Sequence, residues 1–176
     1  MSELWRNPFI RFLIIGSGLY ISWYFLYEYW FKVHSSLDEW IISNLITLTD
    51  GALSILGFEL WNDVSDLAGN YVGIAGGYPL EVGAPCDGLV LHALFLSFIV
   101  AFPGPWRHKI WFAPVGVVLI HAVNVLRIVS LAMIIHYKPE YLDFNHDYTF
   151  TILVYSFVFL LWMIWVKRFS RTNIPG

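Results

Sequence analysis

Four long apolar segments constrain this chain more than any other feature of its sequence. They cover approximately residues 9–31, 88–102, 110–137 and 148–166, and a helix that spans a bilayer needs about 20 apolar residues. Apolar residues make up 58% of the chain and charged residues only 13%, whereas soluble proteins carry roughly 25% charge. Lipid can cover apolar surface that a soluble domain of this size could not bury. The sequence therefore predicts an all-α integral membrane protein with about four transmembrane helices in one domain, residues 1–176.

A further apolar stretch, residues 38–57, is interrupted by polar side chains. Its apolar residues recur at helical spacing, but Asn44, Thr47 and Asp50 lie among them. An Asp in the middle of a span costs about 2.5–3.5 kcal/mol on insertion scales. We therefore expect an amphipathic or re-entrant helix at the membrane surface rather than a fifth span.

Basic residues predict the orientation of the spans. With a cytoplasmic N-terminus, the outer loops are 32–87 and 138–147, and they hold only Lys32 and Lys138. The cytoplasmic segments then hold Arg6, Arg11, Arg107, Lys109, Lys167, Arg168 and Arg171. An excess of positive charge is typical of the cytoplasmic side. We expect both termini in the cytoplasm, a first span kept as an anchor, and turns in the Gly- and Pro-rich part of the first outer loop.

The same composition argues against several functional classes. No basic cluster suggests a nucleic-acid partner, and the bilayer is the partner that the apolar segments require. The single cysteine excludes an intrachain disulfide framework and any site that needs paired thiols. No metal-ligand spacing such as H-E-x-x-H occurs, so we expect neither a metal nor another cofactor.

That single cysteine, Cys86, lies at the outer end of the second predicted span, between Pro85 and Asp87. Pro85 suits the first position of a helix, and a helix N-terminus can lower the pKa of a thiol. The negative charge of Asp87 acts in the opposite direction. Because a lone cysteine in a membrane chain is often only a small buried hydrophobe, Cys86 alone does not define a site.

Arg127 lies inside the third predicted span, which is the second indication of a site. Sixteen residues separate it from Trp111, so it lies about 24 Å above the cytoplasmic edge of a core about 30 Å thick. An arginine at this depth indicates function by default. His121 and Asn124 share its helix face, and we call these three residues the polar stripe. The alternatives are an arginine that reaches the headgroups and a structural hydrogen-bond cluster.

His146 stands at the outer mouth of the fourth predicted span. His92 and His136 are weaker candidates, and His108 belongs to the cytoplasmic turn. A thiol, a guanidinium and an imidazole thus come from three spans to one depth. This set suits nucleophilic acyl transfer, in which a thiolate attacks a carbonyl, an imidazole moves protons and a fixed cation holds the oxyanion.

The motifs "APCDGL", "NVLRI" and "FNHDYTF", in this order across roughly residues 78–160, resemble the exosortase/archaeosortase family. The length is similar to that of compact exosortases such as the exosortase F type. The resemblance implies a cysteine transpeptidase or peptidase in the bacterial cytoplasmic membrane, with its active site facing outward. It would cleave a C-terminal sorting signal of exported proteins, made of a short motif, a membrane helix and a basic tail, through a thioester.

The resemblance also implies a role for each matching residue. Cys86 would be the nucleophile, Arg127 the catalytic arginine, His146 the proton-transfer residue and Asn124 a supporting hydrogen-bond group. Asp87 departs from the family pattern, in which a small polar residue such as Ser is common at this position. An acid beside the nucleophile disfavours the thiolate, but it could orient His146 or Arg127.

Three other functions compete with this interpretation. The protein could be a non-catalytic membrane subunit or assembly factor in which the polar stripe joins helices. It could be a transporter, although the small size and the lack of an internal repeat argue against one. It could be another type of intramembrane protease, but neither a G-x-S-x-G-like motif nor a metal or paired-Asp motif is present.

Overall fold

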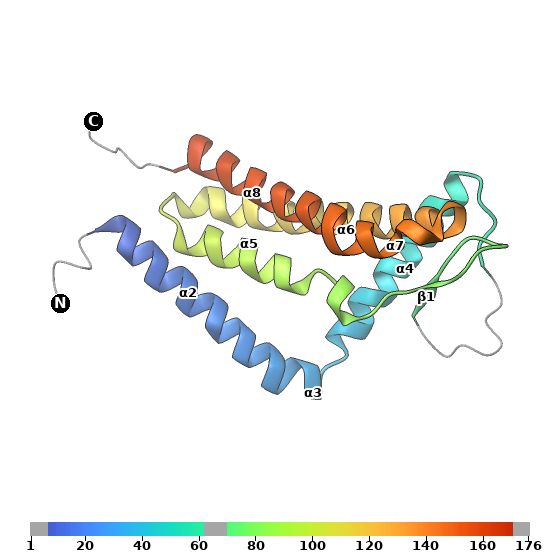
Figure 1. The fold of residues 1–176 in the computed structure, drawn as a ribbon. Coiled ribbons are helices and arrows are strands. Elements are labelled where there is room, and N and C mark those ends of the chain that lie inside the picture. The colour runs from blue at the N-terminus through green and yellow to red at the C-terminus, as the bar shows by residue number, and fades with distance from the viewer. Residues whose placement is uncertain (1–6, 62–69, 171–176) are drawn as a thin grey trace. The chain divides into compact units, whose positions relative to one another are not determined.

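The structure is a computed structural model, which describes residues 7–61 and 70–170 (Figure 1). Two of the basic residues that predict the orientation, Arg6 and Arg171, lie outside the described residues. Helices make up most of the described chain. The strands found there are β1 (Tyr71–Val72) and β2 (Leu80–Glu81), which form one antiparallel pair.

Three helical segments of the described chain are long and apolar enough to cross a membrane. The first runs from Pro8 to His34 through α2 (Pro8–Leu26), the π-helical turn η1 (Tyr27–Phe31) and α3 (Lys32–His34). The second is α6 (Trp106–Tyr137). The third, Pro139–Arg168, joins η3 (Pro139–Tyr141), α7 (Leu142–Phe144), η4 (Asn145–Thr149) and α8 (Phe150–Arg168). The predicted class, an all-α integral membrane protein, is confirmed.

The predicted second span is a shorter helix, α5 (Leu89–Ala101). Its 13 residues rise about 20 Å, less than the core of about 30 Å. Gly88 adopts a positive φ of 80° just before it, a conformation that glycine tolerates and that stops the helix from starting earlier. The sequence Phe102-Pro103-Gly104-Pro105 follows its other end. The helix ends lie within one residue of the predicted 88–102, and its crossing of the membrane stays a prediction.

The second predicted outer loop, 138–147, differs from expectation because it is helical. Pro139 opens the 3₁₀ turn η3, a position that proline favours, and the chain then continues through α7 and η4 into α8. No glycine or proline occurs between residues 140 and 170, so nothing in the sequence breaks the helix. The predicted loop is therefore the first part of the third helical segment.

The amphipathic helix predicted at 38–57 is α4 (Leu37–Ile55). It buries one face through Ile41, Ile42, Leu45, Thr49 and Leu53. It is not among the helices of the described chain that are apolar enough to span a membrane. These observations agree with a helix at the membrane surface.

The chain packs as two compact units, and α6 and α8 contribute residues to both. The first unit consists of residues 1–34, 89–120 and 155–176. Aromatic side chains fill its described part, in which Phe98 stacks on Trp162 with the ring centroids 4.5 Å apart. Phe95 of α5 lies against Gly116 of α6, where a larger residue would have no room. The prediction of a single membrane domain stays a prediction.

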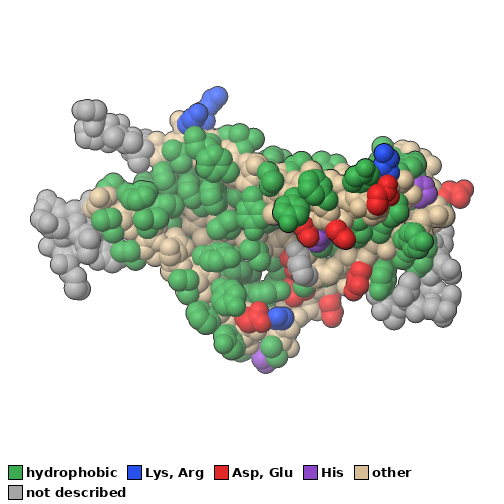
Figure 2. All heavy atoms as spheres, in the orientation of Figure 1, with side chains coloured by type: hydrophobic (Ala, Val, Ile, Leu, Met, Phe, Trp, Pro, Cys, Tyr) green, Lys and Arg blue, Asp and Glu red, His purple; other side chains and the backbone are tan. Residues whose placement is uncertain are grey.

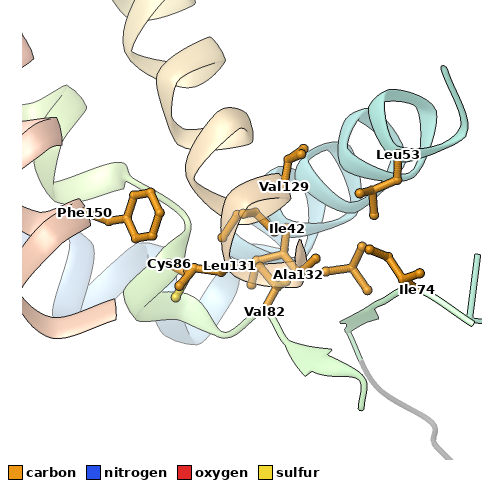
Figure 3. Packing of buried hydrophobic residues seen from close by; sticks show 11 residues of the cluster. Ile42, Leu53, Ile74, Val82, Cys86, Val129, Leu131, Ala132 and Phe150 are labelled. Atoms are coloured by element: carbon orange, nitrogen blue, oxygen red, sulfur yellow. The ribbon is translucent and has the colours of Figure 1, made fainter. Parts of the chain in front are cut away.

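The second unit consists of residues 35–88 and 121–154. Its core joins α4, the β1–β2 pair, the later half of α6 and Phe150 (Figure 3). The two strands pair in the register Tyr71↔Glu81 and Val72↔Leu80. The Gly- and Pro-rich segment predicted to form turns is therefore a small hairpin, and it leads directly to Cys86.

Apolar side chains also cover much of the visible surface in Figure 2. Large exposed ones occur on each candidate membrane-spanning helix, for example Phe9 on α2, Val118 on α6 and Phe159 on α8. Water would disfavour so many exposed apolar groups, whereas hydrocarbon would not. The surface therefore agrees with a protein surrounded by lipid.

Candidate active site

The residues predicted to form the site come from three parts of the second unit. Cys86 ends the 3₁₀ turn η2 (Ala84–Cys86), Asn124 and Arg127 lie on α6, and His146 lies on the π-helical turn η4. Short π-helical turns in proteins occur often at functional sites. All of these residues belong to one compact unit, so their mutual distances are those of a single packed body.

Cys86 is held by a tight turn and is not in the first turn of α5. Its backbone N–H donates to the carbonyl oxygen of Gly83 at 2.8 Å, and Asp87 N–H donates to Ala84 O at 3.2 Å. Pro85 is part of η2, and Gly88 separates η2 from α5. The predicted helix start at Pro85 is therefore corrected, because α5 begins only at Leu89.

The thiol faces the imidazole of His146. The Sγ atom of Cys86 lies 3.6 Å from Nε2 of His146, although 60 residues separate the two in the chain. Figure 3 shows Cys86 within the apolar core, where only 8% of the residue is exposed. An imidazole nitrogen at this distance can accept the proton of the thiol, which is the arrangement of an activated cysteine.

Asp147 orients this imidazole, and sequence reasoning did not identify it. Nδ1–H of His146 donates to Oδ1 of Asp147 at 3.0 Å. A proton held on Nδ1 leaves the lone pair of Nε2 directed at the sulfur. The backbone of His146 is fixed by a second bond, since Thr151 Oγ1 donates to its carbonyl oxygen at 3.3 Å. The acid that follows the histidine in "FNHDYTF" was the available signal.

Asn124 fixes the backbone of the nucleophile. Its Nδ2 donates to the carbonyl oxygen of Cys86 at 2.7 Å, and the asparagine is fully buried. A buried hydrogen bond of this kind holds the turn because breaking it would leave the carbonyl without a partner. The other amide atom, Oδ1, has no hydrogen-bond partner among the described residues.

Four effects act on the pKa of the Cys86 thiol. Burial raises this pKa, the positive charge of Arg127 lowers it, the negative charge of Asp87 raises it, and the smallest effect, a backbone hydrogen bond of Gly83, lowers it. The net effect is a pKa above the ordinary value of a cysteine, so the resting thiol is neutral. A base must therefore remove its proton, and the nearby imidazole of His146 is placed to do so. Asp87 is 3% exposed, which strengthens its charge effect by limiting screening.

The polar stripe predicted on α6 divides into two groups. Asn124 and Arg127 act on Cys86, whereas Nε2 of His121 bonds Oδ1 of Asn44 on α4 at 2.8 Å. His121 therefore connects two helices of the second unit. His92, a weaker candidate, donates from Nε2 to the carbonyl oxygen of Val117 at 3.3 Å within the first unit.

The remaining histidine candidates have other surroundings. His136 lies beside Gly77, where an added Cβ would come 2.8 Å from its Nδ1. His108 belongs to the first unit, with its ring 5.1 Å from that of Phe169. Among the described residues, no group of three or more His, Cys, Asp or Glu side chains could hold a metal ion.

An all-α integral membrane protein in which a buried thiol faces a partly exposed imidazole is the class that the fold and the site define. Residues 11–168 match a family described as transmembrane exosortase. The chain belongs to this exosortase/archaeosortase family, so the predicted resemblance is confirmed; the exosortase F type stays a prediction.

One relative in the comparison is described as a probable archaeosortase D, from Methanocaldococcus jannaschii. It is 29% identical over 161 residues, which cover 90% of this chain and 95% of the relative. No solved structure matches the chain.

Proposed function

We propose that this protein is a cysteine transpeptidase or peptidase that cleaves a C-terminal sorting signal of exported proteins. The observation that carries the proposal is the 3.6 Å contact between Cys86 Sγ and His146 Nε2. This contact pairs a nucleophile with a base, and the charge of Arg127 acts on the same thiol. Membership of the exosortase/archaeosortase family supports the same chemistry.

The proposed reaction begins when Nε2 of His146 takes the proton of the Cys86 thiol. The thiolate forms a bond to the carbonyl carbon of the scissile peptide, and the carbonyl electrons move to the oxygen. Arg127 stabilises the resulting oxyanion, because a fixed cation in a partly buried site acts strongly on developing charge. The tetrahedral intermediate then expels the amine, which takes the proton from His146. A thioester remains on Cys86.

A second nucleophile, either an amine or water, completes the proposed reaction. It attacks the thioester, gives its proton to His146 and releases the thiolate, which then takes this proton from His146 and restores the resting thiol. The two outcomes are transpeptidation and hydrolysis. Throughout both steps Asp147 keeps the proton of His146 on Nδ1, and Asn124 keeps the Cys86 turn in place.

We place the proposed site at the outer face of the bacterial cytoplasmic membrane, with both termini in the cytoplasm. The excess of Lys and Arg in the segments assigned to the cytoplasm supports this orientation. The proposed substrates are exported proteins with a short C-terminal motif, a membrane helix and a basic tail. Such a helix would hold the scissile bond at the membrane surface, at the predicted level of Cys86.

Processing in cells tests the proposal with two variants, in a strain that expresses a reporter carrying a candidate sorting signal. Cys86→Ala should abolish cleavage, because the acyl group then has no acceptor. Asp147→Asn should retain binding but slow cleavage about 10²-fold or more, because the imidazole loses its orienting partner. Ser130→Ala on α6 is the control, since within the described chain the Ser130 hydroxyl bonds only Leu126 of its own helix. Undiminished cleavage by Cys86→Ala would refute the proposal.

A second candidate is a non-catalytic membrane subunit or assembly factor. The bond between His121 and Asn44, together with the buried bond from Asn124 to Cys86, favours a structural role for part of the polar stripe. This function requires Cys86→Ala to be harmless and His121→Leu to reduce the amount of folded protein. The same cell experiment therefore separates the two candidates.

A further inference from the structure

A cavity of about 630 Å³ lies in the first unit, where α6 begins and α8 ends. Its lining includes Arg107, His108 and Trp111 from α6, Arg168 at the end of α8 and the following Phe169. None of the residues that line it belongs to the candidate active site. The proposed reaction therefore does not account for it.

The described part of the cavity carries positive charge from two arginines. Arg107 and Arg168 are both exposed, and no Asp or Glu is among its lining residues in the described chain. Neither arginine takes part in an ion pair within that part of the protein. Two guanidinium groups without an acidic partner favour an anion, and their planar donor geometry suits the oxygens of a phosphate.

The position of the cavity favours a ligand at the membrane boundary. Both helices that form it are candidate membrane spans, and it lies at their ends. The rings of Trp111 and Phe169 meet edge to face with the centroids 5.5 Å apart, and tryptophan is typical of the headgroup level. Nδ1 of His108 is buried and has no hydrogen-bond partner among the described residues, so it could bond a ligand oxygen.

We propose that this cavity binds the headgroup of an anionic phospholipid, with Arg107 and Arg168 holding its phosphate. A water molecule takes about 30 Å³ of liquid volume, so the cavity has room for a phosphate with its ester groups. The apolar helix surfaces below it can accompany the acyl chains. Basic pockets between membrane helices on the cytoplasmic side bind such headgroups, and the predicted orientation places this cavity on that side.

Binding of defined lipids to the purified full chain tests the proposal. The probes are phosphatidylglycerol, phosphatidylcholine and inorganic phosphate, and bound lipid is counted by native mass spectrometry in a neutral detergent. Arg107→Gln/Arg168→Gln should weaken phosphatidylglycerol binding by about 30-fold, and each single variant by about fivefold. The control, Arg11→Gln/Lys167→Gln, removes the same charge outside the cavity and should bind as the wild type does.

Each other outcome would overturn the proposal. Equal loss in the control would mean that general surface charge attracts the lipid. Equal binding of phosphatidylcholine would mean that the site does not select anionic headgroups. Binding of inorganic phosphate without binding of phosphatidylglycerol would assign the cavity to a free anion. The melting temperature without lipid checks folding. If the double variant fails to fold, the loss of phosphatidylglycerol binding in the two single variants tests the proposal instead.

Discussion

Replacing Arg127 by Gln should change how the reactivity of Cys86 depends on pH. The guanidinium lowers the pKa of this thiol, against the opposing effects of burial and of Asp87. Its removal should therefore move the titration of the thiol to higher pH. Because Cys86 is the only cysteine in the chain, a thiol reagent reports on this site alone.

The size of the effect follows from two opposing terms. A nearby opposite charge typically changes the thiolate population at fixed pH by a factor of about 10 or more. We use the lower end, because Asp87 acts on the same thiol in the opposite direction. The thiolate of a less acidic thiol is also a better nucleophile. At a Brønsted coefficient of about 0.4–0.5, this raises the reaction rate of the thiolate about threefold. Arg127→Gln should thus react about threefold more slowly near pH 7 and about threefold faster on the high-pH plateau.

The assay is the rate of reaction with a small chromogenic aromatic disulfide, measured across pH on the purified full chain. The expected result is that the wild-type and Arg127→Gln curves cross. Asp87→Asn provides the matched opposite change, because removing the acid should lower the pKa of Cys86 and shift its curve to lower pH. Arg127→Lys keeps the charge and should stay close to the wild type.

Two results would refute this reasoning. If Arg127→Gln lowers the rate by the same factor at every pH, the arginine controls access to the thiol and not its charge. If Asp87→Asn and Arg127→Gln shift the curves in the same direction, electrostatics is not the cause of either change. A purely structural role for Arg127 does not produce crossing curves.

Two further predictions concern stability and are measured by unfolding in detergent. Asn124→Leu should lower the free energy of unfolding by about 1–3 kcal/mol, because the buried Cys86 carbonyl loses its donor; a loss no larger than that of Ser130→Ala would contradict this. Gly104→Ala should cost about 1–3 kcal/mol, because the new Cβ would lie 2.6 Å from Cζ2 of the fully buried Trp165. Gly18→Ala has nothing within 4 Å and should not destabilise, so equal losses for the two glycines would exclude the clash as the cause.

The membrane helices were predictable because each contains a long run of apolar residues, which is visible in the sequence alone. The segment around α5 was placed to within one residue, and α4 was recognised from its helical spacing and its polar interruptions. The outer segment 138–147 was predicted wrongly as a loop. A short polar stretch between two spans is typical of a loop. This one contains no glycine or proline after Pro139, and it forms the first turns of the helical segment that follows.

The candidate site was predictable only as a set of residues. Cys86, Arg127 and His146 were chosen for their chemistry and their depth, and Asn124 for its place on the same helix face. The sequence does not show that Asn124 bonds the Cys86 backbone, or that Asp147 holds the imidazole. It also assigned Cys86 to a helix start, whereas the left-handed Gly88 places it in a separate turn.

The sequence by itself determined that the protein is a helical membrane protein and which side chains could perform acyl transfer. Both properties depend on local composition and on the spacing of residues within one segment. Only the tertiary structure decided that a thiol and an imidazole 60 residues apart meet at 3.6 Å, and that His121 bonds α4 instead of joining them. The physical reason is that such contacts depend on how distant segments pack, and no single stretch of sequence contains that information.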